Sequence, residues 1–401
     1  MAEMKSRERV IRAIEHQETD RIPIDIGGLS NITTMHKDAY RKMQKYLGHE
    51  GEPFEISSML SQSAKPDEYV RKRFKADCYP IYSSGPEGYM KILQTDPVDG
   101  STFYYDDFQV KWACPKNGFF YDPVGHPLAE MKTIDEMEAF DWPDPYDKTN
   151  INGQGIVGLG DKAKDLYENT DYALVVGGIF NGGTFVPIEQ LLGYEKFFKI
   201  LMKKPDTVRY LLDKILTYEK AHWDMLLDEV GKYASVAVLS DDLGSQIAPI
   251  MRPSIYRDVI KPYHKEIVNF IKSKCDHIKI VYHCDGAISE FLPDMLDIGY
   301  DAWNPVQFSA NGMDDTAAIN REYGDKIAFW GGTCDAQGVL SRGTVEEVKE
   351  DVKRRIKDLA PGSGLVLASV HNIQREVPIE NMVALYDSFY EYGTAFMQGK
   401  L

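Results

Sequence analysis

Two short apolar runs each lead into a histidine, and these endings are the residues of the chain best suited to chemistry. The run 278–282 is followed directly by His283, Cys284 and Asp285, and a run near the end of the chain leads to His371. Because successive strand residues point to opposite faces, His283 and Asp285 should share a direction while Cys284 points away. Imidazole and carboxylate groups bind zinc and other divalent metals, and they also transfer protons. We therefore predict a metal site of His283, Asp285 and His371 with an open fourth position.

Further polar residues follow other predicted strands. Asp241 and Asp242 come after the run 235–239, and we expect at least one of them to act in catalysis beside His283. The alternative is that this pair only caps the following helix. We expect four residues near other strand ends to position a substrate: Asn181, Trp303, Asn304 and Gln307. A lone histidine at a strand end is more often structural, so the functional interpretation depends on finding two on the same predicted face.

The elements that must position these residues alternate between strands and helices. Strands are predicted at 22–26, 78–82, 173–179, 235–239, 278–282, 302–306, 327–330 and 365–368, and helices at 205–230, 253–273, 287–298, 313–323 and 344–359. Eight strands alternating with helices predict a (β/α)8 TIM barrel, with catalytic groups at the carboxyl ends of the strands. A doubly wound open sheet is the competing fold, because periodicity alone does not distinguish the two.

Two further segments extend this barrel, which we expect to be one domain over residues 1–401. Residues 1–20 and 36–75 look helical and should cover its bottom or side. Residues 84–148 are rich in Gly, Pro, Tyr and Asp and show alternating stretches, which predicts an inserted β-rich segment on the active-site face. Its aromatic side chains could roof a flat substrate, although packing of this small segment is the favoured role.

Composition limits the classes of partner. The net charge of −16 argues against nucleic acid or an anionic membrane surface. No apolar run approaches the roughly 20 residues that span a bilayer, and the N-terminus lacks a signal-peptide pattern, so we expect a cytoplasmic protein. The five cysteines lack a Cys-x-x-Cys spacing, which indicates reduced thiols, and Cys284 and Cys334 are expected to be small core residues.

Several motifs resemble the uroporphyrinogen decarboxylase-like superfamily over nearly the whole chain. They are Ser6-Arg-Glu-Arg-Val-Ile-Arg-Ala-Ile-Glu-His, Asp20-Arg-Ile-Pro-Ile, Pro262-Tyr-His-Lys, His283-Cys-Asp-Gly, Asn304-Pro-Val-Gln, Leu359-Ala-Pro-Gly-Ser-Gly, and His371-Asn-Ile-Gln with Val377-Pro and Asn381. The resemblance implies a (β/α)8 barrel. Decarboxylases of this superfamily carry an Arg-Gln-Ala-Gly-Arg segment after the first strand that binds substrate carboxylates. The corresponding stretch here, Ile24-Asp-Ile-Gly-Gly-Leu-Ser, has no arginine, and Asp77 alone falls near the position of their catalytic aspartate.

The other branch of this superfamily comprises corrinoid-dependent methyltransferases, which hold zinc with a His-x-Cys and a later Cys. On this chain the histidine matches His283, the first cysteine falls on Asp285, and the later one falls at or near His371. Replacement of both thiolates by harder ligands disfavours an alkylthiol acceptor and favours a methyl donor bound through oxygen.

The resemblance thus implies a methyltransferase that moves a methyl group from a small donor, with an aryl methyl ether favoured, to a separate corrinoid protein. Zinc would be the bound metal, and a homodimer is common among the proteins resembled. Two alternatives stay open from the sequence: a decarboxylase of a small aromatic acid that uses the same barrel mouth, and a binding protein that retains only the fold.

Overall fold

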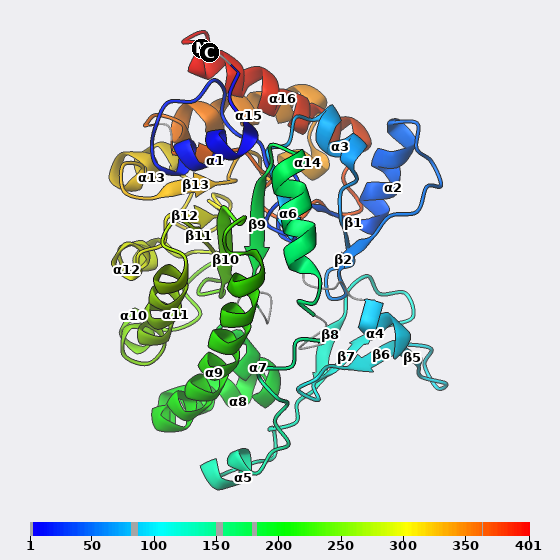
Figure 1. Cartoon of the computed structure of the whole chain (residues 1–401), viewed down its shortest axis with the longest axis vertical. Helices are drawn as coiled ribbons and strands as arrows, with labels where there is room; N and C mark the ends of the chain where they lie inside the picture. The colour runs from blue at the N-terminus through cyan, green and yellow to red at the C-terminus, as the bar shows by residue number, and fades with distance from the viewer. Residues whose placement is uncertain (1–2, 82–86, 150–154, 179–182, 363) are drawn as a thin grey trace.

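A computed structural model describes residues 3–81, 87–149, 155–178, 183–362 and 364–401. Its centre is a curled sheet of seven parallel strands in the order β14-β13-β12-β11-β10-β9-β4 (Figure 1). The strands are β4 Cys78–Ile81, β9 Ala173–Gly177, β10 Val236–Ser240, β11 Lys279–His283, β12 Ala302–Asn304, β13 Ala328–Trp330 and β14 Leu365–Val366. These positions agree with seven of the eight predicted strands. The fold is therefore TIM-barrel-like, as expected.

The eighth predicted strand, 22–26, closes the ring with very little regular pairing. Ile24 forms an isolated parallel bridge with Leu367, whose N–H donates to the carbonyl of Pro23 at 2.8 Å. On its other side, Ile24 accepts a hydrogen bond at 2.7 Å from the backbone N–H of Asp77, directly before β4. Pro23 has no amide hydrogen to donate, so a longer ladder is interrupted here. The segment thus joins the edge strands β14 and β4 through a few backbone hydrogen bonds around Ile24.

Alternation along the strands separates an inner from an outer core. Small and branched side chains face the barrel interior, including Val236, Val238, Val281, Ala302, Ala328 and Val366. Their neighbours in sequence face the helices, including Leu239, Ile280, Tyr282, Trp303, Phe329 and Leu365. His283 continues the inner row that passes through Val281, and Cys284 continues the outer row. Every residue at a strand end therefore has a direction fixed by the row to which it belongs.

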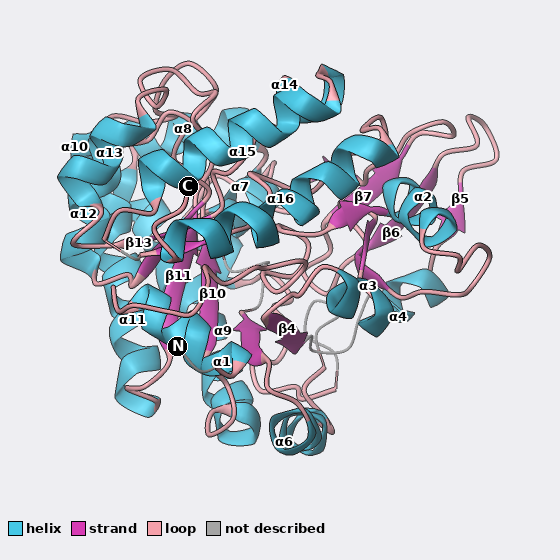
Figure 2. Ribbon diagram, turned by 90° about the horizontal axis from the view of Figure 1, so that it is seen from above, coloured by secondary structure: helices cyan, strands magenta, loops and turns pink. Residues whose placement is uncertain are grey.

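Helices surround this sheet (Figure 2). Those that connect the strands are α6 Leu159–Asn169, α7 Val186–Leu192, α8 Tyr194–Lys203, α9 Pro205–Val230, α11 Lys261–Lys274, α12 Leu292–Ile298, α13 Thr316–Tyr323 and α15 Val345–Leu359, and α1 Ser6–Ile14 and α16 Ile379–Met397 complete the set used below. The predicted bounds of α9 were correct, and the predicted start of α15 is confirmed by a capping box between Thr344 and Glu347. The predicted helix 253–273 contains a π-helical turn at Tyr256–Ile260 before α11 begins. None of the helices in the described residues is long and apolar enough to cross a membrane.

The N-terminal region is less helical than predicted. Within 36–75, α2 Lys37–Tyr46 and α3 Glu68–Arg73 flank a small antiparallel sheet of β1 Met35–His36, β3 Ser63–Ala64 and β2 Ile56–Ser58. This sheet was not predicted, because its strands are only two or three residues long. β1 also bridges Ile373, which attaches the sheet to the loop after β14.

The segment 84–148 contains a four-stranded antiparallel sheet to one side of the barrel (Figure 2). Its strands are β5 Gln94–Thr95, β6 Thr102–Tyr105, β7 Lys111–Cys114 and β8 Asp122–Gly125, and short helices α4 Glu87–Lys91 and α5 Ile134–Glu138 flank them. The ring of Tyr104 contacts those of Tyr89, Trp112 and Tyr121 at 4.8, 6.5 and 5.6 Å between centroids. These aromatic residues pack one another, which fits the packing role that the sequence favoured.

Candidate metal centre and its surroundings

His283, Asp285 and His371 come together at the carboxyl ends of β11 and β14. Asp285 Oδ2 lies 3.6 Å from His283 Nε2 and 3.5 Å from His371 Nε2, and one ligand atom from each residue falls within 4.8 Å of the others. His283 is buried, whereas Asp285 and His371 are half-buried, so the cluster is open on one side. The structure thus brings together the three residues predicted as metal ligands. Cys284 points away into the outer core, as the strand alternation predicted.

The far side of each imidazole is held by an asparagine. The amide Nδ2 of Asn304 donates to the carbonyl of Trp330 at 2.7 Å, so its Oδ1 faces His283 Nδ1, also at 2.7 Å. An amide oxygen only accepts, so His283 Nδ1 carries the hydrogen and Nε2 presents a lone pair toward Asp285. His371 Nδ1 is paired in the same way with Asn372 Oδ1 at 2.6 Å. This arrangement directs both Nε2 lone pairs into the cluster, as in histidine metal sites.

The surroundings of the Asp285 carboxylate suit a bound cation. Its Oδ1 is buried and has no hydrogen-bond partner among the described residues. An unpaired buried carboxylate oxygen is costly, and a divalent ion bound by Asp285 and both imidazoles would remove that cost. The backbone N–H of Asp285 donates to Asp242 Oδ1 at 3.0 Å, which fixes the loop that carries the ligand. The donor set, two imidazoles and one carboxylate, is one that zinc accepts.

Two more carboxyl groups lie around the cluster with altered acidity. Desolvation in the barrel mouth and repulsion from Asp285 raise the pKa of Asp242, although its side chain is still reached by solvent. Burial raises the pKa of Glu189 on α7 to about 7, and the charges of Asp241 and Asp242 contribute to that shift. Glu189 can therefore hold a proton near neutral pH, and Asp242 binds a proton more readily than an ordinary aspartate. Glu189 was not predicted, because it lies on a helix and the sequence pattern has no signal for it.

Asp241 lies on the outer side of β10, opposite to Asp242. Its carboxylate accepts hydrogen bonds at 2.9–3.1 Å from the backbone amides of Thr184, Phe185 and Val186, which lead into α7. It also pairs with His264 Nε2 at 2.8 Å and is only 1% exposed. With both oxygens occupied in the core, Asp241 positions the loop before α7. The capping alternative therefore describes Asp241 better than the predicted direct part in catalysis.

The predicted substrate-binding residues have different locations. Trp303 is fully buried on the outer face of β12 against Phe329, so the direct contact predicted for it does not fit the structure. The same strand alternation that excluded Cys284 could have excluded it. Gln307 accepts from the backbone N–H of Gly286 at 2.7 Å and holds the loop after β11. Asn304 supports His283, and Asn181 lies outside the described residues.

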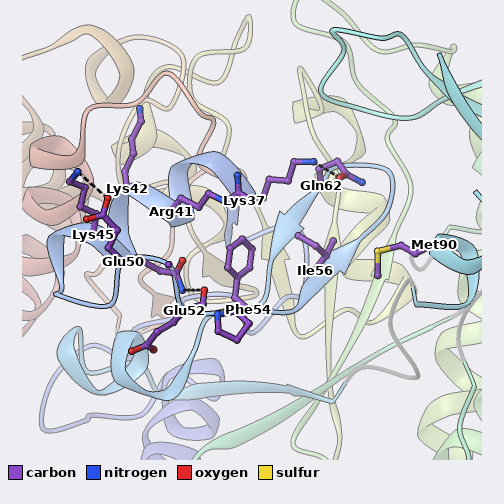
Figure 3. A pocket seen from close by; sticks show the side chains of 13 residues that line it. Lys37, Arg41, Lys42, Lys45, Glu50, Glu52, Phe54, Ile56, Gln62 and Met90 are labelled. Atoms are coloured by element: carbon purple, nitrogen blue, oxygen red, sulfur yellow. Dashed lines mark hydrogen bonds and ion pairs between the residues drawn. The ribbon is translucent and has the colours of Figure 1, made fainter. Parts of the chain in front are cut away.

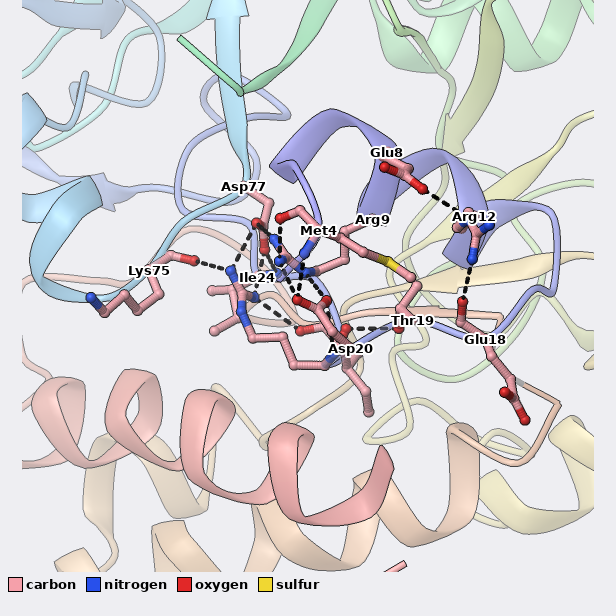
Figure 4. Close-up of polar contacts among 12 residues, drawn as sticks. Met4, Glu8, Arg9, Arg12, Glu18, Thr19, Asp20, Ile24, Lys75 and Asp77 are labelled. Carbon is pink, nitrogen blue, oxygen red and sulfur yellow. Dashed lines mark hydrogen bonds and ion pairs between the residues drawn. The ribbon is translucent and has the colours of Figure 1, made fainter. Parts of the chain in front are cut away.

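Asp77 lies directly before β4, at the amino end of the parallel strands and therefore opposite to this cluster. Figure 4 shows the polar contacts around it. It is fully buried and pairs with Arg9 at 2.6 Å and with Arg21 at 2.7 Å. Its Oδ2 also accepts from the backbone N–H of Ile24 at 2.8 Å. Asp77 therefore ties the closing segment to β4 and lies away from the candidate metal ligands.

A closed ring of parallel strands with a His–Asp–His cluster at its carboxyl end defines a (β/α)8 barrel protein with a candidate metal centre. The family model for uroporphyrinogen decarboxylase (URO-D) matches residues 133–392, well over half of the chain. The chain therefore belongs to the uroporphyrinogen decarboxylase family.

Individual relatives are distant. The uroporphyrinogen decarboxylase of Alkalilimnicola ehrlichii is 20% identical over 405 aligned residues, which cover 96% of this chain and 93% of that protein. One from Coxiella burnetii is 24% identical over 195 residues, 48% of this chain and 50% of that protein. A solved structure of a methyltransferase from Methanosarcina mazei superposes with a TM-score of 0.65 at 16% identity, over 97% of this chain and 99% of that one. That similarity supports the barrel fold.

Proposed function

We propose that this protein is a methyltransferase that removes a methyl group from a small neutral donor, with methoxylated aromatic compounds as the favoured class. The methyl acceptor would be a corrinoid carried by a separate partner protein. The observation that supports the proposal most strongly is the convergence of His283 Nε2, Asp285 Oδ2 and His371 Nε2 at the barrel mouth. A ligand set without thiolate suits activation of a donor bound through oxygen.

The chain would hold zinc through these three residues and leave a fourth position for the donor. When bound, zinc would act as a Lewis acid on the ether oxygen. The chain itself would orient the metal ligands and supply the proton. Asn304 and Asn372 hold the two imidazoles, and Glu189, with a pKa near 7, would donate a proton to the phenolate oxygen as the C–O bond breaks.

The charges at the mouth disfavour the alternative of an aromatic-acid decarboxylase. Desolvation is the largest influence on the pKa values of Asp242 and Glu189, and the charges that follow it are carboxylates and imidazoles. Among the described residues, no lysine or arginine is prominent in these two shifts, so an anionic substrate would meet carboxylates and not a guanidinium fork. Arg9 and Arg21 are occupied at the far end of the barrel by Asp77. A neutral donor meets no such repulsion.

Metal analysis of the purified protein tests the first half of the proposal. We expect one zinc per chain, lost in His371→Ala and bound about 10- to 100-fold more weakly in Asn304→Ala, because that change removes the hydrogen-bond partner of the ligand His283. The matched control is His277→Ala, which alters an exposed histidine directly before the run that forms β11. Stoichiometric zinc that survives His371→Ala would contradict the assigned ligand set.

Demethylation tests the second half. The zinc-loaded chain is mixed with free cob(I)alamin and a series of methoxybenzenes, and loss of the Co(I) absorbance is followed. We expect a change that requires both the donor and His371. Release of CO₂ from benzoic acids without any change in the corrinoid spectrum would instead favour the decarboxylase.

A further inference from the structure

A basic cleft lies beside α2, outside the barrel mouth (Figure 3). It has a volume of about 830 Å³, and Lys37, Arg41, Lys42 and Lys45 of α2 line it together with Phe54, Ile56 and Met90. In a chain with a net charge of −16, four cations on one ten-residue helix are a local reversal of charge. Lys37, Arg41 and Lys45 are spaced by four residues and therefore form one stripe along α2.

Most of this positive charge is not neutralised within the protein. Lys45 forms an exposed ion pair with Glu50 at 3.0 Å. Lys37 donates to the neutral Gln62, and Lys42 donates to the backbone carbonyls of Arg375 and Val377. Within the described part of the chain, Lys37, Arg41 and Lys42 have no carboxylate within ion-pair distance. These three cations therefore carry charge that no carboxylate of the described residues neutralises.

The cleft and the metal cluster are joined through one loop. The loop that starts at His371 passes Ile373, whose carbonyl accepts from the N–H of His36 at the start of α2. The same loop is held by Lys42 through the carbonyls of Arg375 and Val377. Arg375 stacks on Phe119 at 3.7 Å from the ring centroid, and Phe119 is 40% exposed. An arginine of this loop thus packs on an exposed aromatic ring, which also contacts His36 at the start of α2, and such residues are enriched at protein interfaces.

The form of the cleft favours an extended acidic protein segment over a small anion. Its cations are spread over nine residues of α2, about 12 Å of helix, and do not converge on one point. Glu50 and Glu52 also line the cleft, so its positive charge is confined to the side formed by α2. The apolar floor of Phe54, Ile56 and Met90 offers a place for an apolar side chain between acidic ones.

We infer that this cleft, with Phe119 at its edge, is the docking surface for the partner protein of the methyl transfer, and that the partner presents an acidic segment with an apolar side chain. The inference rests on the proposed function for the identity of the partner. Contact along the loop that carries His371 would bring the partner close to the barrel mouth. Because surface charge pairs act mainly on encounter, the complex should weaken as ionic strength rises.

The test is direct binding of a purified corrinoid protein by titration calorimetry at low and at moderate salt. Arg41→Glu is the informative variant, since Arg41 is exposed and forms no ion pair within the described residues. We expect its Kd to rise about tenfold at low salt and the salt dependence to become shallower. Phe119→Ser should raise Kd by a similar factor at both salt concentrations. Lys164→Glu, the same charge change on an exposed residue of α6, is the matched control and should leave Kd unchanged.

Methyl transfer to free cob(I)alamin separates this inference from the proposed function. Arg41→Glu should keep its rate with the free acceptor within about twofold and lose rate only with the corrinoid protein, since charge removal at a rim acts on association. Demethylation by the wild type without binding of the corrinoid protein would overturn the docking surface alone. An unchanged Kd in Arg41→Glu would also overturn the docking surface. A change of oligomeric state in that variant would overturn it as well, because the cleft would then join two copies of this chain. Binding without methyl transfer to either acceptor would support the surface and contradict the proposed function.

Discussion

At the scale of single residues, the site depends on which atom of each side chain is left free. Asn304 donates to Trp330 and so must accept from His283, which leaves His283 Nε2 available to a metal. Asp285 has one oxygen close to both histidines and one that is buried with no hydrogen-bond partner among the described residues. The sequence could place these residue types at strand ends. It could not show that Asn304 serves the histidine instead of a substrate, because that depends on a hydrogen bond to another strand.

Glu189 gives a prediction that does not depend on the proposed reaction. Burial raises its pKa from 4.5 to about 7, so the folded protein binds one more proton than the unfolded chain between these values. Its contribution therefore makes the fold less stable as pH rises through this window. We expect Glu189→Gln to match the wild type near pH 4.5 and to be about 1–3 kcal/mol more stable at pH 8. Urea unfolding at both pH values measures this difference.

The control for Glu189 is Glu168→Gln, which neutralises an exposed glutamate of α6. A loss of stability in Glu189→Gln at pH 8 would contradict the assigned protonation. In the demethylation assay, the same variant should lack the decline in kcat that the wild type shows as pH rises through about 7, because its amide does not titrate.

At the scale of elements, two adjacent aspartates have opposite functions because they lie on opposite faces of one strand. Asp241 points to the helices and holds the backbone that leads into α7, while Asp242 points into the mouth. The alternation of β10 was readable in the sequence, and it separates the pair in principle. What the sequence lacked was the position of the loop at 184–186, which is brought to Asp241 by folding of a distant segment.

Exchange of these two aspartates for asparagine should therefore have unequal effects. Asp241→Asn leaves His264 and three backbone amides without a carboxylate, so we expect a loss of about 2–4 kcal/mol of unfolding free energy. Asp242→Asn relieves repulsion with Asp285 and should change stability by less than about 1 kcal/mol. Chemical denaturation of both variants checks this comparison. Equal stability with a selective loss of catalysis in Asp241→Asn would return Asp241 to a direct catalytic role.

Helices and strands were predictable to the extent that their patterns are long. The bounds of α9 follow from Pro205 and a sustained apolar face, and the start of α15 follows from the capping residues Thr344 and Glu347. The segment 22–26 was predicted as a strand, but Pro23 limits its regular pairing to one isolated β-bridge, between Ile24 and Leu367. The three short strands between residues 35 and 64 are held by contacts with the rest of the molecule, which a local pattern does not contain.

At the scale of the whole molecule, the two ends of the barrel are divided between chemistry and stability, as is usual for this fold. The carboxyl end carries the imidazoles and Glu189, whose pKa is raised to about 7. The amino end carries Arg9, Arg21, Asp20 and Asp77, which join α1 and the closing segment to β4. The family resemblance predicted the barrel correctly. It did not show at which end of the barrel Asp77 lies, because that depends on which end of its strand the residue occupies.

The amino-end network should determine how the protein responds to acid. Burial raises the pKa of Asp20, but hydrogen bonds and charge from Arg9 outweigh this and lower it to about 2. A carboxylate with a depressed pKa stabilises the fold above its ordinary value of 3.8, and this contribution is lost as pH falls toward 2.

We expect Asp77→Asn, which leaves two buried guanidiniums short of a partner, to cost about 3–5 kcal/mol at pH 7 with zinc content unchanged. Asp171→Asn, which removes an exposed pair with Lys5, should cost less than about 1 kcal/mol. Urea unfolding at pH 7 measures the loss of stability in the two variants, and acid titration from pH 5 to 2 measures the contribution of Asp20. An Asp77→Asn variant as stable as the wild type would mean that closure of the barrel depends on the backbone bridge of Ile24 alone.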